Sequence, residues 1–250
     1  MAGSVMTGGG VGSMHPTQRS YPVALALLVA LYFMIGFITV LNDILIPSMK
    51  DLFDLKASQA MLIQFAFFIA YGIWSIPAGI LIEKIGYKKG LVVALGVIAT
   101  GLFLFVPAAS IMKYGFFLFV LFVVASGLTF MQVALNPLIV AVGPEKTGSS
   151  RMNLGGTMNS FATTIGPIIG GAFILQSVHE GDFTSHELFL AAKSHAVQGP
   201  YVVLALVIIA IATALYFIKL PEIGLDKSKE TTAHDQSETK ESIFDYHHLL

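Results

Sequence analysis

Two polar residues interrupt a long apolar segment near the start of the chain. Asn42 and Asp43 lie in FITVLNDILIPSMK (37–50), and the chain is otherwise hydrophobic from Pro22 onward. An aspartate at the centre of a bilayer costs ~2.5–3.5 kcal/mol on the insertion scale, so such groups face a protein interior or an aqueous cavity. A carboxylate there can hydrogen-bond a polyol, carry a transported proton, or do both. The alternative is that the span ends here, because Pro47 follows Asp43 and the headgroup layer is then close.

Uncharged amides recur in the other apolar segments. Gln64 and Tyr71 share one face of a helix in QFAFFIAYGIW, and Gln132 and Asn136 lie one turn apart in FMQVALNPLIV. Asn159 lies in a stripe of small and polar residues, RMNLGGTMNSF. Sugars have polar rims and apolar C–H faces, which amides and aromatic rings contact together. These residue types favour binding of a hydroxylated solute, while close helix packing is the alternative explanation for the small residues.

The composition is that of a membrane protein. Of the 250 residues, 55% are apolar and 12% are charged, and the mean hydropathy is +0.78; soluble domains have about 25% charged residues. Several apolar stretches reach the ~20 residues with which a helix crosses a bilayer, and no alternating strand pattern recurs. We expect an all-α membrane protein, a bundle of six transmembrane helices with spans at about 22–47, 58–82, 89–107, 114–142, 151–178 and 198–219.

The segments outside the spans predict how the chain is oriented. Residues 1–21 are rich in glycine and serine and predict a disordered arm, and residues 22–219 form the transmembrane domain. Residues 220–250 predict a charged linker that ends in FDYHHLL, the start of a seventh helix. Lysine and arginine are concentrated on the side of these end segments, so the positive-inside rule places both termini in the cytoplasm. The outer loop at about 179–197 contains irregularly spaced histidines, for which we expect solvation and no metal.

The motifs of common enzymes and of ATP-driven pumps are absent. The sequence has no G-x-x-x-x-G-K-[ST] loop, no HExxH motif and no catalytic triad pattern. Cysteine is absent too, which excludes disulfides and thiolate chemistry. We therefore expect no enzyme activity, no catalytic residue, no cofactor and no nucleic-acid partner.

The loop between the second and third spans has a distinctive pattern. GILIEKIGYKKG (79–90) combines two glycines, an acid–base pair and a basic pair. The pattern G-x-x-x-[DE]-[RK]-x-G-[RK]-[RK] at this location resembles the signature loop of the major facilitator superfamily, although an ordinary positive-inside turn is the alternative. The resemblance implies a conformational latch at the cytoplasmic helix ends, formed by Gly79, Glu83, Lys84, Gly86, Lys88 and Lys89.

Further stretches narrow this resemblance. LNDILIP with QAMLIQFAFF, then ALNPLIVAVGPE, then RMNLGGTMNSF followed by IGP, and VQGPY are similar to the fucose–proton symporter family, which includes bacterial glucose/galactose transporters. The likeness covers residues ~22–220. Members of that family are twelve-helix sugar carriers coupled to a cation. The resemblance implies that Asp43 matches a carboxylate important for sugar binding and that Asn159 matches an amide of the sugar site.

Two departures from the fucose branch bear on coupling and on the sugar. The fucose branch has a proton-carrying glutamate where this chain has Gln132, and a glutamine where it has Gly156. A glutamine does not titrate, so we expect no proton transfer through Gln132. Glucose/galactose-type members resemble this chain in having glutamine there, which favours an aldohexose and leaves the coupling ion, H⁺ or Na⁺, open.

The resemblance implies the N-terminal half of a major facilitator fold, built of two inverted three-helix repeats. LNDILI (41–46) and LNPLIV (135–140) echo one another in the first and fourth spans, and coincidence between leucine-rich helices explains this echo equally well. We expect a cation-coupled hexose importer in the bacterial inner membrane, whose partners are the sugar, the lipid bilayer and a C-terminal six-helix half. A non-transporting membrane fragment or scaffold and an exporter of the same superfamily are the alternatives. The residues expected to contact sugar are Asn42, Asp43, Gln64, Tyr71, Gln132, Asn136 and Asn159.

Overall fold

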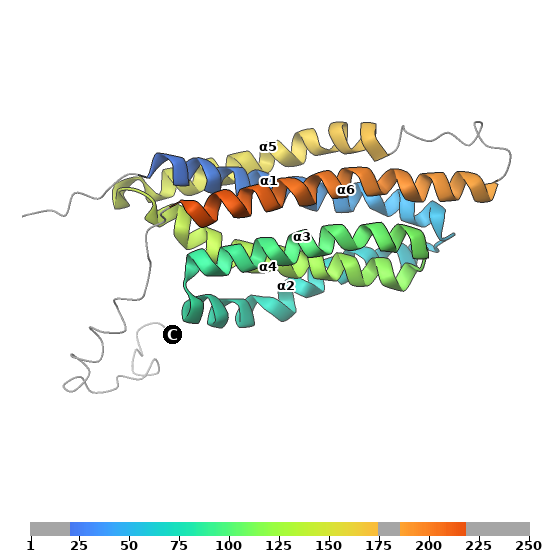
Figure 1. Cartoon of the computed structure of the whole chain (residues 1–250), viewed down its shortest axis with the longest axis horizontal. Coiled ribbons are helices and arrows are strands. Elements are labelled where there is room, and N and C mark those ends of the chain that lie inside the picture. The colour runs from blue at the N-terminus through green and yellow to red at the C-terminus, as the bar shows by residue number, and fades with distance from the viewer. Residues whose placement is uncertain (1–20, 175–185, 219–250) are drawn as a thin grey trace, which may run out of the picture.

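The computed structural model describes residues 21–174 and 186–218, and all regular structure in these ranges is helical. Long helices lie side by side, and α1 begins at the same end of the bundle at which α6 ends (Figure 1). We call this the terminal end. The elements are α1 (Pro22–Leu52), α2 (Ala57–Ile85), α3 (Tyr87–Ile111), α4 (Tyr114–Ala141), a short 3₁₀ helix η1 (Glu145–Thr147), α5 (Gly148–Ile174) and α6 (His186–Phe217).

Within the described ranges, five helices are long and apolar enough to cross a membrane: α1 to α4 and the Gln198–Phe217 part of α6. The expected span at 151–178 corresponds to α5, which is 27 residues long. It is not among those five, because asparagine, serine and threonine recur along it. A polar helix inside such a bundle is stable where it faces protein or a water-filled cavity.

Two helix boundaries differ from the expected ones. α1 continues through Pro47 to Leu52 instead of ending near residue 47, because neighbouring helices compensate for a proline in a membrane helix. α6 begins at His186, so much of the loop expected at 179–197 is helical. Residues 186–197 include three alanines, two leucines, one glutamate and one lysine, which are good helix formers. Two histidines, Glu187 and Lys193 lower the mean hydropathy of this segment, so hydropathy alone does not detect that it is helical.

The helices form two triplets, α1 to α3 and α4 to α6, and each helix packs mainly on helices of the other triplet. α1 packs on α5, α2 packs on α4, and α3 packs on both α4 and α6. The first helix of each triplet, α1 or α4, thus contacts the second helix of the other triplet, α5 or α2. Inverted repeats have this reciprocal arrangement.

Glycines let α1 and α5 approach closely. A Cβ added at Gly36 would lie 2.4 Å from the backbone oxygen of Asn159, and one added at Gly155 would lie 2.7 Å from the ring of Tyr32. Both distances are shorter than any real Cβ contact, so a side chain at either position forces the helices apart. Small residues at membrane helix interfaces commonly allow such close crossings.

Two cations hold helix ends together at the terminal end. Arg151, at the start of α5, is buried and donates all five of its guanidinium N–H groups. Lys88 Nζ donates to the carbonyl of Tyr216 at the end of α6 over 2.9 Å. Both cations donate to carbonyls at the C-terminal end of another helix, α4 for Arg151 and α6 for Lys88, where the dipole favours positive charge. The acceptors of Arg151 are the carbonyls of Ile139, Val140, Gly143 and Pro144 and the hydroxyl of Thr147.

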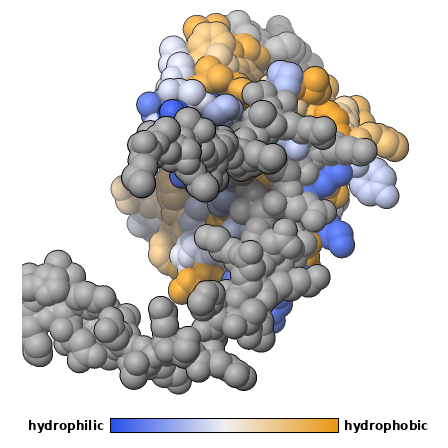
Figure 2. Space-filling view, turned by 90° about the vertical axis from the view of Figure 1, so that its left-hand side faces the viewer, coloured by the Kyte–Doolittle hydropathy of each residue, from blue (hydrophilic) through white to orange (hydrophobic). Residues whose placement is uncertain are grey.

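The loop expected to act as a latch lies at this same end. Gly86 joins α2 to α3 with φ +88°, a left-handed conformation that favours glycine. Glu83, Lys84 and Lys89 are exposed, and no salt bridge joins Glu83 to the lysines of this loop in the described chain. Hydrophilic residues are interspersed with apolar ones at this end (Figure 2). The latch role of Gly79, Glu83, Lys84, Gly86, Lys88 and Lys89 stays a prediction.

Candidate solute-binding cavity

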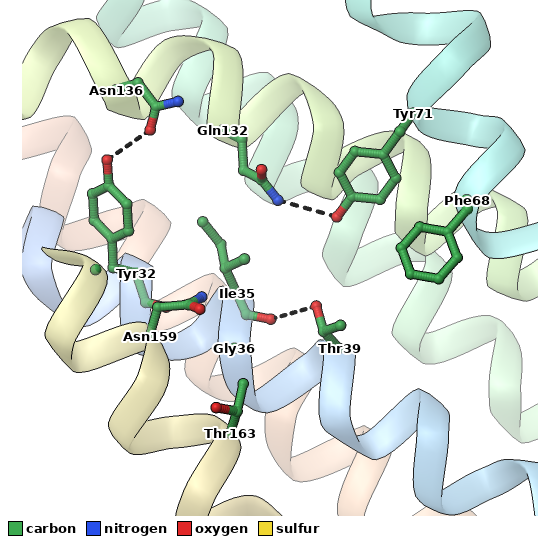
Figure 3. Close-up of a pocket in the computed structure, with 11 residues that line it drawn as sticks. Tyr32, Ile35, Gly36, Thr39, Phe68, Tyr71, Gln132, Asn136, Asn159 and Thr163 are labelled. Carbon is green, nitrogen blue, oxygen red and sulfur yellow. Dashed lines mark hydrogen bonds between the residues drawn. The ribbon is translucent and has the colours of Figure 1, made fainter. Parts of the chain in front are cut away.

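A cavity of about 420 Å³ lies among α1, α2, α4 and α5. Its size is within the range of small-molecule sites, about 300–1,000 Å³. Side chains from α1 and α5 face those from α2 and α4 across it (Figure 3). The lining residues are Tyr32, Ile35, Gly36, Thr39, Phe68, Tyr71, Gln132, Asn136, Gly156, Asn159 and Thr163.

Hydrogen bonds between helices order the polar groups of the cavity. The Tyr32 hydroxyl donates to Oδ1 of Asn136 over 2.6 Å, which links α1 to α4. Gln132 Nε2 donates to the Tyr71 hydroxyl oxygen over 3.1 Å, which links α4 to α2. Asn159 Nδ2 donates to the backbone oxygen of Tyr32 over 3.1 Å, which links α5 to α1. The amide groups are therefore held in defined orientations before any solute binds.

These bonds leave part of each amide available to a solute. Gln132 Oε1 and Asn159 Oδ1 remain as acceptors, and the Asn136 amide nitrogen remains as a donor, since no other described residue bonds them. All the lining residues are uncharged. The cavity thus offers both donors and acceptors without a net charge, which suits a neutral, hydroxylated solute.

An aromatic wall faces these amides from α2. The rings of Phe68 and Tyr71 lie 6.2 Å apart, and Phe68 is 57% exposed although it lies in an apolar helix. Figure 3 shows both rings directed toward the cavity from α2. An apolar ring surface opposite a set of amides matches the two kinds of surface that a sugar presents.

Four of the seven predicted sugar-contacting residues line this cavity: Tyr71, Gln132, Asn136 and Asn159. The structure does not bring the other three to its lining. Asp43 is exposed and accepts a hydrogen bond from Gln64 Nε2 over 2.8 Å. It lies one turn beyond Thr39, whose side chain is in the lining. Asn42 is buried in the bundle, at 2% exposure.

Seven of the lining residues were not in the predicted set. Three of these seven lie on the same helix faces as residues that were predicted. Phe68 lies beside Tyr71 on α2, and Gly156 and Thr163 flank Asn159 on α5. The α1 residues carried a usable signal. Side chains three or four residues apart lie on one face of a helix. Counting back from Asp43 at this spacing gives Thr39, then Ile35 and Gly36, and then Tyr32.

Gly155 and Gly156 are adjacent in α5 but have opposite surroundings. Gly155 meets the Tyr32 ring, whereas a Cβ at Gly156 would meet nothing within 4 Å. We expect Gly155→Ala to lower the free energy of unfolding by about 1–3 kcal/mol, as overpacking does. We expect Gly156→Ala to leave stability within about 0.5 kcal/mol of the wild type. Thermal unfolding in detergent micelles measures both, and equal losses in the two variants would contradict this contact.

The apolar helices form two groups of three, α1 to α3 and α4 to α6, which pack on each other and enclose a neutral polar cavity. This arrangement defines the class of protein as one half of a membrane carrier. Comparison with known families agrees. The model of the Major Facilitator Superfamily matches residues 28–247, so the chain belongs to that superfamily. Its homologues are multi-pass transporters, which confirms the expectations that the chain is a membrane protein and is not an enzyme.

The similar proteins narrow the resemblance to sugar carriers. The chain is 42% identical over 250 residues to the glucose/galactose transporter of Brucella abortus biovar 1 (strain 9-941). This match covers 100% of this chain and 58% of that protein. It is 38% identical over 221 residues to the L-fucose-proton symporter of Escherichia coli (strain K12), covering 85% of this chain and 50% of that protein. The chain therefore spans about half the length of the curated relatives it matches.

A solved structure confirms the fold. The crystal structure of the Major Facilitator Superfamily transporter FucP in the outward conformation is 40% identical, with a TM-score of 0.69 over 81% of this chain and 51% of that one. The chain has the N-terminal half of this fold, as the resemblance implied. The expected helical bundle is thereby confirmed. The predicted arm at 1–21 and linker at 220–250 lie almost entirely outside the described residues.

Proposed function

We propose that this chain forms one half of a cation-coupled hexose importer that works by alternating access. The observation that carries the proposal is the neutral cavity, in which partly unpaired amides face aromatic rings. The relatives named as glucose/galactose transporter and L-fucose-proton symporter support a hexose of these types. A C-terminal six-helix half would supply the opposite wall, as in other carriers of this superfamily.

The polarity of the cavity favours a sugar over the substrates of an exporter. Gln132, Asn136 and Asn159 come from two helices and leave both donors and acceptors unpaired. An exporter of amphipathic compounds would gain affinity from an apolar lining, and unpaired amides would reduce that affinity through desolvation. A hexose replaces the lost water contacts with its own hydroxyl groups.

The coupling cation in this proposal acts at Asp43. Asp43 is the only acidic residue of the chain within the expected spans, and the lining of the cavity contains no carboxylate. Asp43 lies one turn beyond the lining, where Gln64 orients it by a hydrogen bond. Gln132 does not titrate, so H⁺ or Na⁺ would be bound through Asp43. With both termini in the cytoplasm of a bacterium, the cation gradient would drive import.

Counterflow of labelled glucose, galactose and fucose tests the sugar proposal. Membrane vesicles containing the carrier, this chain together with its second half, are loaded with unlabelled sugar and exposed to labelled sugar. We expect labelled glucose or galactose to enter transiently above its equilibrium level. Equilibration without any overshoot for all three sugars would favour the non-transporting scaffold.

Replacing Asp43 with asparagine tests the coupling proposal. One charge moved across 100 mV supplies ~2.3 kcal/mol, roughly a fifty-fold gradient. We expect Asp43→Asn to reduce cation-driven accumulation about ten-fold while counterflow continues, because the sugar contacts remain. Asp54→Asn is the control, since Asp54 lies beyond the end of α1 at φ +46°, a conformation that asparagine adopts readily. Normal accumulation in Asp43→Asn would remove that residue from the mechanism.

A further inference from the structure

Gly156 is a glycine that the packing of the helices does not explain. It lies in the interior of α5, where glycine is the poorest helix former apart from proline. Its neighbour Gly155 has a packing reason, since a Cβ there would lie 2.7 Å from the ring of Tyr32. A Cβ at Gly156 would meet nothing within 4 Å. The contacts between the described helices therefore leave room for a side chain at position 156.

The place of Gly156 in the cavity wall separates it from the other glycines with open space. Gly36, the other glycine of the lining, is closed off by α5, because a Cβ there would lie 2.4 Å from the backbone oxygen of Asn159. Among the described glycines, Gly156 alone combines open space with a place in the lining. The open glycines outside the lining are Gly72, Gly79, Gly86, Gly96, Gly115 and Gly199.

Gly156 shares one face of α5 with two polar residues of the cavity. Asn159 and Thr163 follow it by three and seven residues, and all three line the cavity. A glycine on such a face lets a ligand come close to the backbone, because no side chain stands between them. The space beside Gly156 therefore belongs to the cavity in which the sugar is proposed to bind.

The groups around the cavity indicate which part of a hexose suits this space. The hydroxyl groups on the ring need hydrogen-bond partners, and the free amide atoms of Gln132, Asn136 and Asn159 supply them. Position 156 has no side-chain donor or acceptor. The hydroxymethyl group at C5 of a hexose ring adds a methylene, which gains dispersion energy from a bare Cα and from the Tyr32 ring in the same lining.

We propose that Gly156 admits the hydroxymethyl group of the hexose and thereby limits the size of the sugar that binds. The proposal rests on the proposed hexose function and adds a specificity-determining residue to it. A side chain at position 156 would occupy the space that this group needs. Such a variant would still accept a pentose, which has the ring hydroxyl groups but lacks the hydroxymethyl group.

Glucose and xylose together test this role, because they share the ring and its hydroxyl groups and differ in the hydroxymethyl group. Competition of each unlabelled sugar with labelled glucose for the purified complete carrier gives both affinities. We expect Gly156→Ala to weaken glucose binding about five-fold and Gly156→Val about 30-fold, the range that overpacking of a filled site produces. The affinity for xylose should change less than about two-fold in either variant.

Gly96 provides the matched control. It lies in the interior of α3, has nothing within 4 Å of a Cβ, and is outside the cavity lining. Gly96→Ala and Gly96→Val should each leave the affinities for glucose and xylose within about two-fold of the wild type. The Tm of every variant carrier is measured alongside, and we expect Gly156→Ala to melt with the wild type.

Several results would overturn the role of Gly156 while leaving the hexose function in place. These are equal losses of glucose and xylose binding, unchanged glucose binding in Gly156→Val, and failure of xylose to compete in the wild type. A lower Tm for the Gly156→Ala carrier would also overturn it, because a side chain of the second half would then fill the space. A wild-type carrier that binds neither glucose nor galactose would overturn the hexose function itself, and the role of Gly156 with it.

Discussion

Replacing Arg151 with lysine is expected to lower the free energy of unfolding by about 3 kcal/mol. Arg151 connects α5 to the end of α4 through five N–H groups, each of which has an acceptor. Lysine has three donors on one nitrogen and lacks the planar fork, so it leaves several buried carbonyls unpaired. Each lost hydrogen bond costs about 0.5–1.5 kcal/mol. In thermal unfolding of the purified protein, Tm should fall by about 6–12 °C.

Lys146→Ala is the control for this prediction. Lys146 lies in η1 beside the same turn but is exposed, so its removal should change Tm by less than about 2 °C. The two variants separate the guanidinium contacts from the general effect of removing a positive charge at this end. A Tm for Arg151→Lys within that same margin would show that the guanidinium contacts do not hold α4 and α5 together.

Replacing Asn159 with leucine is expected to lower the affinity for the sugar about 100-fold. The change removes the bond from Nδ2 to the backbone oxygen of Tyr32 and the free Oδ1 acceptor in the cavity. Two lost hydrogen bonds, one of which leaves a carbonyl unpaired, together cost about 2–3 kcal/mol. That free energy corresponds to a factor of about 100. Equilibrium binding of labelled glucose and galactose to the purified carrier measures the change.

Asn153→Leu is the matched control on the same helix. Asn153 lies on α5 outside the cavity lining and is exposed. The same substitution there should change sugar affinity less than about two-fold. If both variants bind sugar as the wild type does, the cavity is not the sugar site. If both lose binding to the same extent, the effect belongs to α5 as a whole and not to the Asn159 amide.

Much of the fold was predictable because hydropathy is a local property of the sequence. In hydrocarbon each backbone group must be paired within its own segment, so an apolar stretch of sufficient length is a helix. α2, α3 and α4 accordingly begin and end within a few residues of the predicted spans. The start of α6 at His186 was missed because Glu187, Lys193 and two histidines lower the mean hydropathy of the added segment, and hydropathy does not report its helix propensity.

Part of the cavity was predictable for a related reason. An amide in hydrocarbon needs a hydrogen-bond partner, so residue type alone predicted that Gln132, Asn136 and Asn159 face the interior of the bundle. Their partners were not predictable. Tyr32 shares the α1 face of Asp43, but neither its type nor its position shows that its hydroxyl and its backbone carbonyl order two of these three amides.

The sequence by itself determined a helical membrane bundle, its likeness to one half of a sugar carrier and the amides of its interior, because these follow from composition and spacing along single helices. The tertiary structure decided which polar groups meet. Close α1–α5 packing at Gly36 and Gly155 brings Asn159 to the cavity, while the pairing of Asp43 with Gln64 holds that carboxylate one turn beyond it. Such contacts depend on the crossing and rotation of helices distant in sequence, and side-chain packing between helices sets both.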